Sequence, residues 1–282
     1  MTTGMTSDAI ASAFQAACLA ELDALKPGNV HRHAESVEPA VSDFERSAAA
    51  AAPAISAQGL TVGQRIEEAV RATRAAVSHN TNLGIVLLAA PLAQAALTAT
   101  NGSLRLSLAE VLAALTVDDA RCAYRAIRMA EPGGLGNAPE HDVAADPSTT
   151  LLDAMRAAAT RDRIAWNYAN GFVDIFDLGL NWREGGIIRW GDVPSVATYI
   201  YLGFLAHVPD TLIERKFGPH VAAEVLDEAR PIESGLAQCH DPKEMMRPLI
   251  AFDASLRERG LNPGTSADLT VATLFAGALA GA

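Results

Sequence analysis

The sequence predicts an all-α fold in a single domain over residues 1–282, on three observations. Roughly one residue in five is alanine, which is the best helix former and is depleted from strands. Apolar residues recur at helical spacing along most of the chain, whereas the alternation typical of strands is scarce. Half of the residues are hydrophobic, so the chain can bury a large core. A division into two domains near residue 140 is the weaker alternative.

The first helix is expected to begin at Thr6 or Ser7, whose side chains can cap it. Its apolar stripe carries Ile10 and Phe14, and it should end at Lys26-Pro27-Gly28-Asn29, because proline and glycine break helices. Further helices are expected over residues 42–55, 62–78, 83–98, 104–114, 117–131 and 148–176. After an irregular hairpin over residues 181–192, helices are expected to resume from Val196 and near Gly218, Lys243 and Ser266.

The charge and the cysteines exclude several classes of protein. The chain has 22 basic and 33 acidic residues and a net charge of −11, whereas a general nucleic-acid binder needs a basic face. Its three cysteines are far apart and include no C-x-x-C pair. Neither a disulfide framework nor a cysteine zinc site is therefore expected.

The hydropathy pattern predicts a protein that does not associate with a membrane. The most apolar run, residues 83–99, is interrupted by Pro91 and Gln94, and it falls short of the ~20 residues that cross a bilayer. No signal peptide is apparent near the N-terminus. We therefore expect a cytoplasmic protein, and its Ala-rich surface could support a homodimer.

Two carboxylates fall on apolar helix stripes. Glu21 lies on the same stripe as Ile10, and Asp162 is the one charge on the stripe expected over residues 148–176. A carboxylate in an apolar environment costs free energy unless it is paired, hydrogen-bonded or bound to a metal. A salt bridge from Arg161 or another arginine to Asp162 and a functional role are both open.

Four loop segments mix glycine or proline with asparagine, threonine, lysine or aspartate at a helix boundary. They are Lys26-Pro27-Gly28-Asn29, His79-Asn80-Thr81-Asn82-Leu83-Gly84, Pro132-Gly133-Gly134-Leu135-Gly136 and Asn262-Pro263-Gly264-Thr265-Ser266-Ala267-Asp268. Backbone N–H groups at such boundaries bind phosphate with the help of the helix dipole. Lys26 could add a point charge, and acids beside phosphates favour Mg²⁺.

Each segment also has a purely structural interpretation. Lys26-Pro27-Gly28 is typical of a helix end, and Thr265 with Asp268 resembles a capping box. Asn80 and Asn82 can be ordinary turn residues. The glycines at positions 133 and 134 could merely end a helix.

Two further polar pairs are expected to face solvent. His31 and His33 are two residues apart in a loop, and Asp174 and Asp177 share one face of a helix. None of the seven histidines has the spacing of a known metal-binding motif.

Taken in order, the four segments resemble the motifs of the triphosphoribosyl-dephospho-CoA synthase family. The family's P-K-P-G motif matches Lys26-Pro27-Gly28, and its S-P-G-G-S-A-D-L motif matches residues 262–269 closely. Its N-T-H-K-G motif matches residues 80–84 in part, with Asn82 for the histidine and Leu83 for the lysine. With these two replacements the motif is similar to that of a divergent branch of the family in archaea and methylotrophic bacteria. An Asp-Thr segment of the family resembles Asp210-Thr211.

The resemblance implies an enzyme that acts on small-molecule nucleotides. Members transfer a triphosphoribosyl group from ATP to a ribose hydroxyl of 3′-dephospho-CoA, and adenine leaves. ATP is thus implied as a substrate and Mg²⁺ as its companion, with Glu21, Asp162 and Asp268 supplying carboxylates for the metal or for base catalysis. The implied nucleotide-binding residues are Lys26, Gly28, Asn29, Asn80, Thr81, Asn82, Gly133, Gly134, Asp210, Asn262, Gly264, Thr265 and Ser266.

Two alternatives stay open. Displacement on ATP inverts C1 of the ribose and gives an α-riboside, as in methanopterin-type cofactors, so the acceptor could be a precursor of such a cofactor. The chain could instead be a non-catalytic helical binding or assembly protein whose motifs are caps and turns. Convergence of the Lys26, Asn80, Gly134 and Asp268 regions on one pocket would favour an enzyme, and scattering would favour the second alternative.

Overall fold

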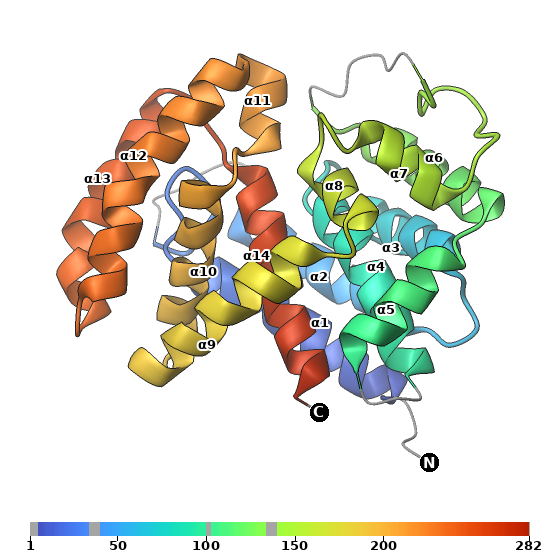
Figure 1. Ribbon diagram of the computed structural model, residues 1–282, viewed down its shortest axis with the longest axis horizontal. Helices are drawn as coiled ribbons and strands as arrows, with labels where there is room; N and C mark the ends of the chain where they lie inside the picture. The colour runs from blue at the N-terminus through green and yellow to red at the C-terminus, as the bar shows by residue number, and fades with distance from the viewer. Residues whose placement is uncertain (1–4, 34–39, 100–102, 134–139, 282) are drawn as a thin grey trace.

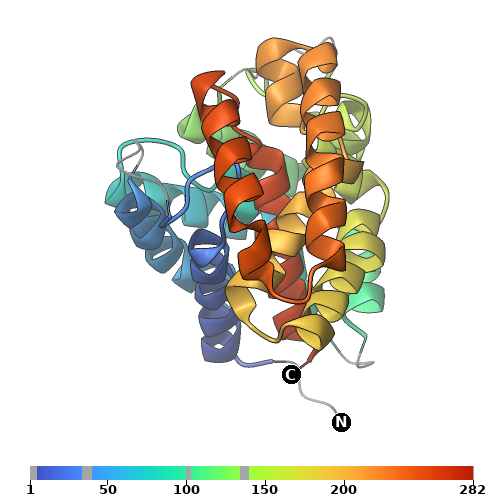
Figure 2. The same ribbon diagram turned by 90° about the vertical axis from the view of Figure 1, so that its left-hand side faces the viewer.

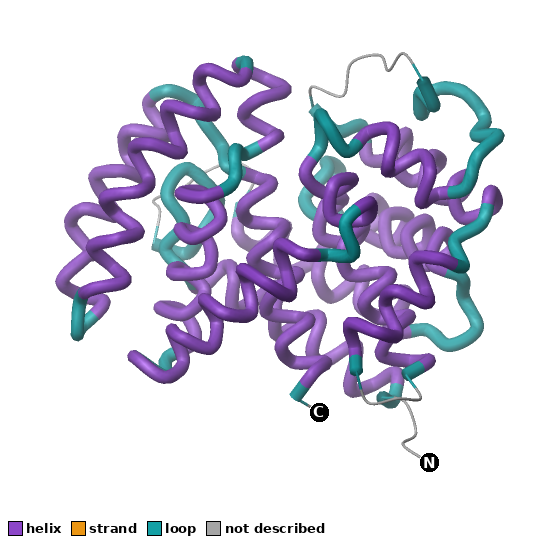
Figure 3. The backbone as a smooth tube through the Cα atoms, viewed as in Figure 1, coloured by secondary structure: helices purple, strands orange, loops and turns teal. Residues whose placement is uncertain are grey.

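The computed structural model describes residues 5–33, 40–99, 103–133 and 140–281, which form helices joined by loops and turns (Figure 3). No strand occurs within these ranges. The expected all-α domain is confirmed. In chain order the elements are α1 (Ser7–Asp23), α2 (Val41–Ser56), α3 (Val62–Ala76), α4 (Leu83–Thr98), α5 (Leu104–Ala113), α6 (Val117–Ala130), α7 (Leu151–Ala158), α8 (Arg163–Ala169), η1 (Asp174–Gly179), α9 (Leu180–Arg189), α10 (Val193–His207), α11 (Thr211–Phe217), α12 (Pro219–Gln238), η2 (Pro242–Met245), α13 (Met246–Glu258) and α14 (Gly264–Ala280).

Side-chain caps explain why many of these helices begin where they do. Thr6, Ser103 and Thr150 each accept a hydrogen bond from a backbone N–H in the first turn of α1, α5 and α7. Thr61 and Thr116 form complete capping boxes at α3 and α6. These caps satisfy N–H groups that a helix leaves without an internal partner.

Helix α14 runs through the middle of the molecule (Figure 1). It contacts α1, α4, α9, α10 and η1, and its small residues let these elements approach closely. A Cβ at Gly277, for example, would lie 2.5 Å from the Nε atom of Arg183. Because so many elements meet on α14, a side chain in its first turns can face residues that are distant in sequence.

Two groups of buried apolar side chains meet at α10 and α14. The larger cluster joins α1 to α8 with parts of α10 and α14, and the smaller one joins α10 to α13. Figure 2 shows α12 and α13 running beside each other on the side of the molecule that faces the viewer. The two clusters together hold the halves of the chain against each other around α14.

Two expectations for the middle of the chain are wrong. Residues 148–176 do not form one helix, because Asp162 caps α8 and because Gly171 and Phe172 adopt φ values of 63° and 59°. Residues 181–192 do not form a hairpin, because α9 continues to Arg189 and packs on α10 and α14. The sequence also does not predict the short helix α11.

The structure also describes the three cysteines and the apolar helices, on which two of the sequence predictions depended. Cys18, Cys122 and Cys239 are all buried and free. In the described part of the chain no single helix is long and apolar enough to cross a bilayer, although the bent pair of α10 and α11 meets that test when taken together.

Candidate functional site

A cavity of about 520 Å³ is lined by residues from all four loop segments singled out in the sequence. Residues of α1, α4, α6, α7, α8, α11 and α14 line it, together with the loops between them. The predicted residues that line it are Glu21, Asn29, Asn80, Thr81, Asn82, Gly133, Asp162, Asn262, Gly264, Thr265 and Asp268. Lys26, Gly28, Asp210 and Ser266 do not line it, and Gly134 lies outside the described residues. The Asn29, Asn80, Gly133 and Asp268 regions thus converge on one cavity, which favours an enzyme.

Lys26 lies behind the cavity wall and not in the cavity. Its side chain is fully buried, and its ammonium forms an ion pair with Glu21 and donates a hydrogen bond to Asn29 Oδ1 at 3.2 Å. Burial is the largest influence on both members of the pair, and it lowers the pKa of Lys26 and raises the pKa of Glu21. A buried, paired ammonium is not available to a phosphate, so the expectation that Lys26 binds phosphate is not supported by this geometry.

Of the three predicted carboxylates, Asp268 is the one that lines the cavity without a partner. It is half-buried in the second turn of α14, and among the described residues it makes no hydrogen bond or ion pair. Removal from water is the main cause that raises its pKa well above the ordinary value, and the neighbouring charges of Asp210 and Glu21 add to the rise. An unpaired carboxyl with a raised pKa is a suitable proton acceptor.

Asp162 performs two structural tasks at the cavity edge. Its Oδ1 accepts the N–H of Ala165 at 3.0 Å and so caps α8, and its Oδ2 forms an ion pair with Arg215 of α11. The arginine partner expected for Asp162 is therefore Arg215, and Arg161 is left without this role. The pair holds the start of α8 against α11.

The three predicted carboxylates do not form a metal site together. No group of three or more metal-binding side chains lies close enough to hold an ion within the part of the chain that the structure describes. Glu21 is paired with Lys26 and Asp162 with Arg215, which leaves Asp268 as a single available carboxylate.

Asp210 and Ser266 join α11 to α14. Asp210 is buried, and its Oδ1 accepts the N–H groups of Leu212 and Ile213 at the start of α11. Its Oδ2 accepts the N–H of Ser266 at 2.8 Å and the hydroxyl of Ser266 at 2.9 Å. Burial, the largest cause, raises the pKa of Asp210. These two residues therefore position the site and do not line it.

Thr265 does not form the capping box with Asp268 that the sequence suggested. The residue before α14 is Pro263, and no side chain caps this helix, so the expected capping box between Thr265 and Asp268 is wrong. The Thr265 hydroxyl lies 3.1 Å from that of Thr211 and accepts the N–H of Leu212 at 3.2 Å. With its carboxylate free of a capping role, Asp268 can face the cavity.

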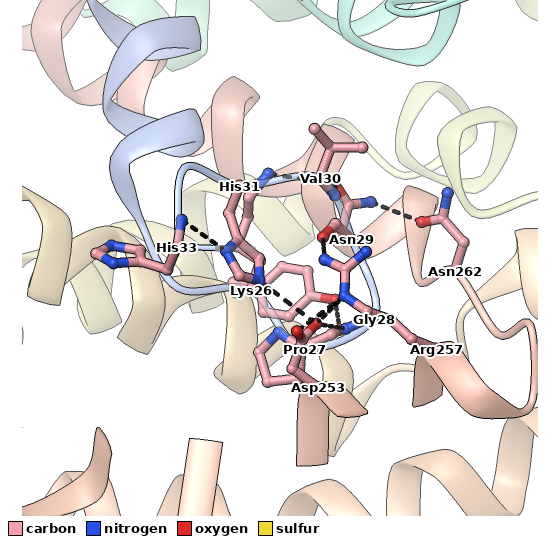
Figure 4. Close-up of polar contacts among 11 residues, drawn as sticks. Lys26, Pro27, Gly28, Asn29, Val30, His31, His33, Asp253, Arg257 and Asn262 are labelled. Carbon is pink, nitrogen blue, oxygen red and sulfur yellow. Dashed lines mark hydrogen bonds and ion pairs between the residues drawn. The ribbon is translucent and has the colours of Figure 1, made fainter. Parts of the chain in front are cut away.

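The Lys26–Asn29 loop is clamped onto α13 (Figure 4). The N–H of Gly28 donates to Asp253 Oδ1 at 2.8 Å, and Arg257 donates to the carbonyl of Asn29 at 2.5 Å. Asn29 Nδ2 in turn donates to Asn262 Oδ1 at 2.7 Å. Gly28 has a φ of 79°, and a Cβ there would lie 2.7 Å from the Leu261 carbonyl oxygen. The clamp places the two asparagine side chains at the cavity edge.

The segment before α4 is held by its own polar side chains. Asn80 Oδ1 accepts the N–H of Leu83 at 3.1 Å, and Asn82 Nδ2 donates to Thr73 Oγ1 at 3.0 Å. The Thr81 hydroxyl lies 2.5 Å from that of Ser47. The turn interpretation is therefore right for Asn80, and the segment still lines the cavity.

In each of the two polar pairs expected to face solvent, one residue is buried and the other is exposed. His31 is buried, whereas His33 is exposed. Asp174 is buried and forms an ion pair with Arg163 at 2.7 Å, whereas Asp177 is exposed. Which member of each pair is buried depends on how the helices pack, and the local sequence pattern does not show this.

Three cations of the cavity are not among the predicted site residues. Arg161 precedes α8, and Arg215 and Lys216 belong to α11, yet all three line the cavity. The only sequence signal for the last two is the cluster of charges that follows Asp210-Thr211.

Comparison with known proteins gives a family and solved structures with a similar fold. Residues 7–282 match the family model described as CitG, ATP:dephospho-CoA triphosphoribosyl transferase. The crystal structure of a proposed triphosphoribosyl-dephospho-CoA synthase from Archaeoglobus fulgidus matches with a TM-score of 0.61 and 22% identity, over 82% of this chain and 95% of that chain. At this identity the likeness shows a shared fold. No curated protein matches the chain.

Proposed function

Because the chain belongs to the ATP:dephospho-CoA triphosphoribosyl transferase family, we propose that its cavity is the active site and that Asp268 is the catalytic base. The chain is a transferase that moves the triphosphoribosyl group of ATP to dephospho-CoA. Family membership supports this reaction but assigns no residue of this chain. The roles below follow from the geometry of the cavity.

The reaction makes three demands on the site. The acceptor oxygen forms a bond to C1 of the ATP ribose, and the bond from C1 to adenine breaks with its electron pair going to adenine. The acceptor hydroxyl loses a proton, adenine gains one, and positive charge develops on the ribose as in glycoside chemistry. The site therefore needs a proton acceptor, groups that orient two ribosides, and cations for the phosphates.

The unpaired carboxylate of Asp268 is the observation that carries the proposal. Glu21 is paired with Lys26, and Asp162 is paired with Arg215, so neither is free to accept a proton. Asp268 faces the same cavity without a partner among the described residues. In its ionised form it can take the acceptor proton and stabilise the positive ribose.

Four amide side chains give the cavity groups that can orient ribose hydroxyls. Asn29 and Asn262 reach it from the clamped loop and from the segment before α14, and Asn80 and Asn82 reach it from the segment before α4. Amides donate and accept hydrogen bonds, as hydroxyl recognition requires. The clamp and the turn fix these side chains before substrate arrives, which reduces the entropy cost of binding.

The donor set fits Mg²⁺ only as a companion of the substrate phosphates. Mg²⁺ in proteins commonly has one or two carboxylate ligands, with substrate phosphates and water completing its shell. Of the three predicted carboxylates, Asp268 is the one left unpaired that would contribute, and when bound the ion would neutralise phosphate charge. Since ATP and a coenzyme A precursor are intracellular metabolites, we also place the enzyme in the cytoplasm.

The test is adenine release from ATP in the presence of dephospho-CoA, compared between wild type and Asp268→Asn. We expect release by wild type only with dephospho-CoA, and a loss of at least ~100-fold in the variant, with ATP binding retained by calorimetry. Asp177→Asn, which removes an exposed carboxylate paired with Arg105, is the matched control and should retain full activity. Full activity of Asp268→Asn would remove Asp268 from the mechanism. Tight ATP binding without adenine release by wild type would contradict the acceptor.

A further inference from the structure

The cavity carries two cations that have no carboxylate partner. Arg161 lies in the turn between α7 and α8, and Lys216 lies in α11. Both side chains line the cavity and both residues are exposed. Neither forms an ion pair with any residue that the structure describes. Unpaired cations at a cavity edge are available to an anionic ligand.

The structure holds these cations in place from two sides. Helix α11 is anchored to α14 through Asp210 and Ser266, and Arg215 on the same helix pairs with Asp162. Asp162 directly follows Arg161, so the pair also fixes the turn that carries this cation. Figure 1 shows α11 at the top of the molecule and α8 lower down, and both contribute to the cavity.

Gly133 leaves room beside Lys216. A Cβ built at Gly133 would lie 3.2 Å from Cε and 3.6 Å from Nζ of Lys216. The backbone that follows α6 thus approaches the ammonium without a side chain that would cover it. Glu131 also lines the cavity, and it makes no ion pair with Lys216 within the described ranges.

Three backbone amides at the start of α14, where phosphate binding was first expected, already have partners. At the start of α14 the N–H of Gly264 donates to Asn262 O, that of Ser266 to Asp210 Oδ2 and that of Ala267 to Pro263 O. Lys26 is buried against Glu21. These three amides and Lys26 are therefore not available to a phosphate chain in the cavity.

We propose that Arg161 and Lys216, with Arg215 behind them, form a subsite for a polyphosphate chain. This inference rests on the proposed function, because both substrates carry such a chain: the triphosphate of ATP and the diphosphate of dephospho-CoA. Arginine binds phosphate oxygens in a bidentate manner and lysine binds them as a point charge.

The test uses inorganic tripolyphosphate as a probe that does not depend on turnover. We expect wild type to bind it by calorimetry, and the double variant Arg161→Gln/Lys216→Gln to bind it at least ~10-fold more weakly. Arg156→Gln/Lys243→Gln removes the same charge from exposed residues outside the cavity, and it should bind like wild type. Absence of binding by wild type, or equal binding by the Arg161/Lys216 double variant, would overturn the subsite.

Adenine-release kinetics then identify which substrate uses the subsite. An increase in the KM for ATP alone assigns the subsite to the triphosphate, and an increase in the KM for dephospho-CoA alone assigns it to the diphosphate. Unchanged KM values for both substrates would overturn the proposal even if tripolyphosphate binds. If wild type releases no adenine, the proposed function fails, while the tripolyphosphate measurement still decides whether the subsite exists.

Discussion

The carboxylate of Asp268 on α14 lies directly against the Cα atom of Gly84 at the start of α4. A Cβ at position 84 would lie 2.5 Å from Asp268 Cγ and 2.7 Å from Cδ1 of Ile164. The absence of a side chain at this one position therefore sets where the proposed base sits. It also links the segment of Asn80 to that of Asp268, which are far apart in the chain.

Replacing Gly84 by alanine should displace the base. Because a misplacement of about 1 Å can cost ~100-fold in rate, we expect Gly84→Ala to lower kcat by about that factor. Gly185→Ala is the matched control, since a Cβ there meets no atom within 4 Å. It should leave kcat unchanged and stabilise α9 by up to about 1 kcal/mol. Equal kcat values for the two variants would show that the Gly84 contact does not position Asp268.

Breaking the buried pair of Lys26 and Glu21 should destabilise the fold. We expect Lys26→Met to lower the free energy of unfolding by about 3–5 kcal/mol, because it leaves an uncompensated buried carboxylate. The double variant Glu21→Leu/Lys26→Met should recover most of this loss, since no buried charge remains. Urea unfolding of the wild type and both variants measures the difference. A Lys26→Met variant as stable as wild type would contradict a buried ion pair.

His31 should make the fold less stable in mild acid. Burial, the largest influence, lowers the pKa of His31 below its ordinary value of 6.5, against the opposing effect of Asp253. The charges of Arg257 and Lys26 lower it further. The unfolded chain then binds a proton that the folded chain does not, so stability falls as the pH drops below about 6.5 toward the folded-state pKa.

A variant without the imidazole isolates this effect. We expect the difference in Tm between pH 7.5 and pH 5.5 to be smaller in His31→Gln than in wild type. His33→Gln, which changes the exposed neighbouring histidine, should keep the wild-type difference. The same pH dependence in all three proteins would assign it to other groups.

The rate of the reaction should rise with pH through the raised pKa of Asp268. The carboxylate must be ionised to accept a proton, and its pKa lies well above the ordinary 3.8 because of burial and the charges of Asp210 and Glu21. We therefore expect the acidic limb of kcat/KM to lie well above pH 3.8. ATP binding measured over the same pH range separates this limb from titration of the phosphates. A limb that follows ATP binding alone would argue against a titrating base.

The sequence by itself determined the fold class and the segments that meet at the cavity. Helix-forming composition and apolar spacing are local properties, so α4 was predicted at residues 83–98, where the structure places it. Turn residues such as Asn80 and Gly133 interrupt helices for equally local reasons. The same local patterns carried the family resemblance, which the match over residues 7–282 confirms.

Only the tertiary structure decided which of these residues are available for chemistry. Lys26 and Asp268 look equally suitable in the sequence, but packing buries one against Glu21 and leaves the other unpaired in the cavity. Arg161 and Lys216 come together from segments more than fifty residues apart. Burial and pairing depend on contacts between distant segments, and the free energy of a charged group depends on those contacts more than on its neighbours in the chain.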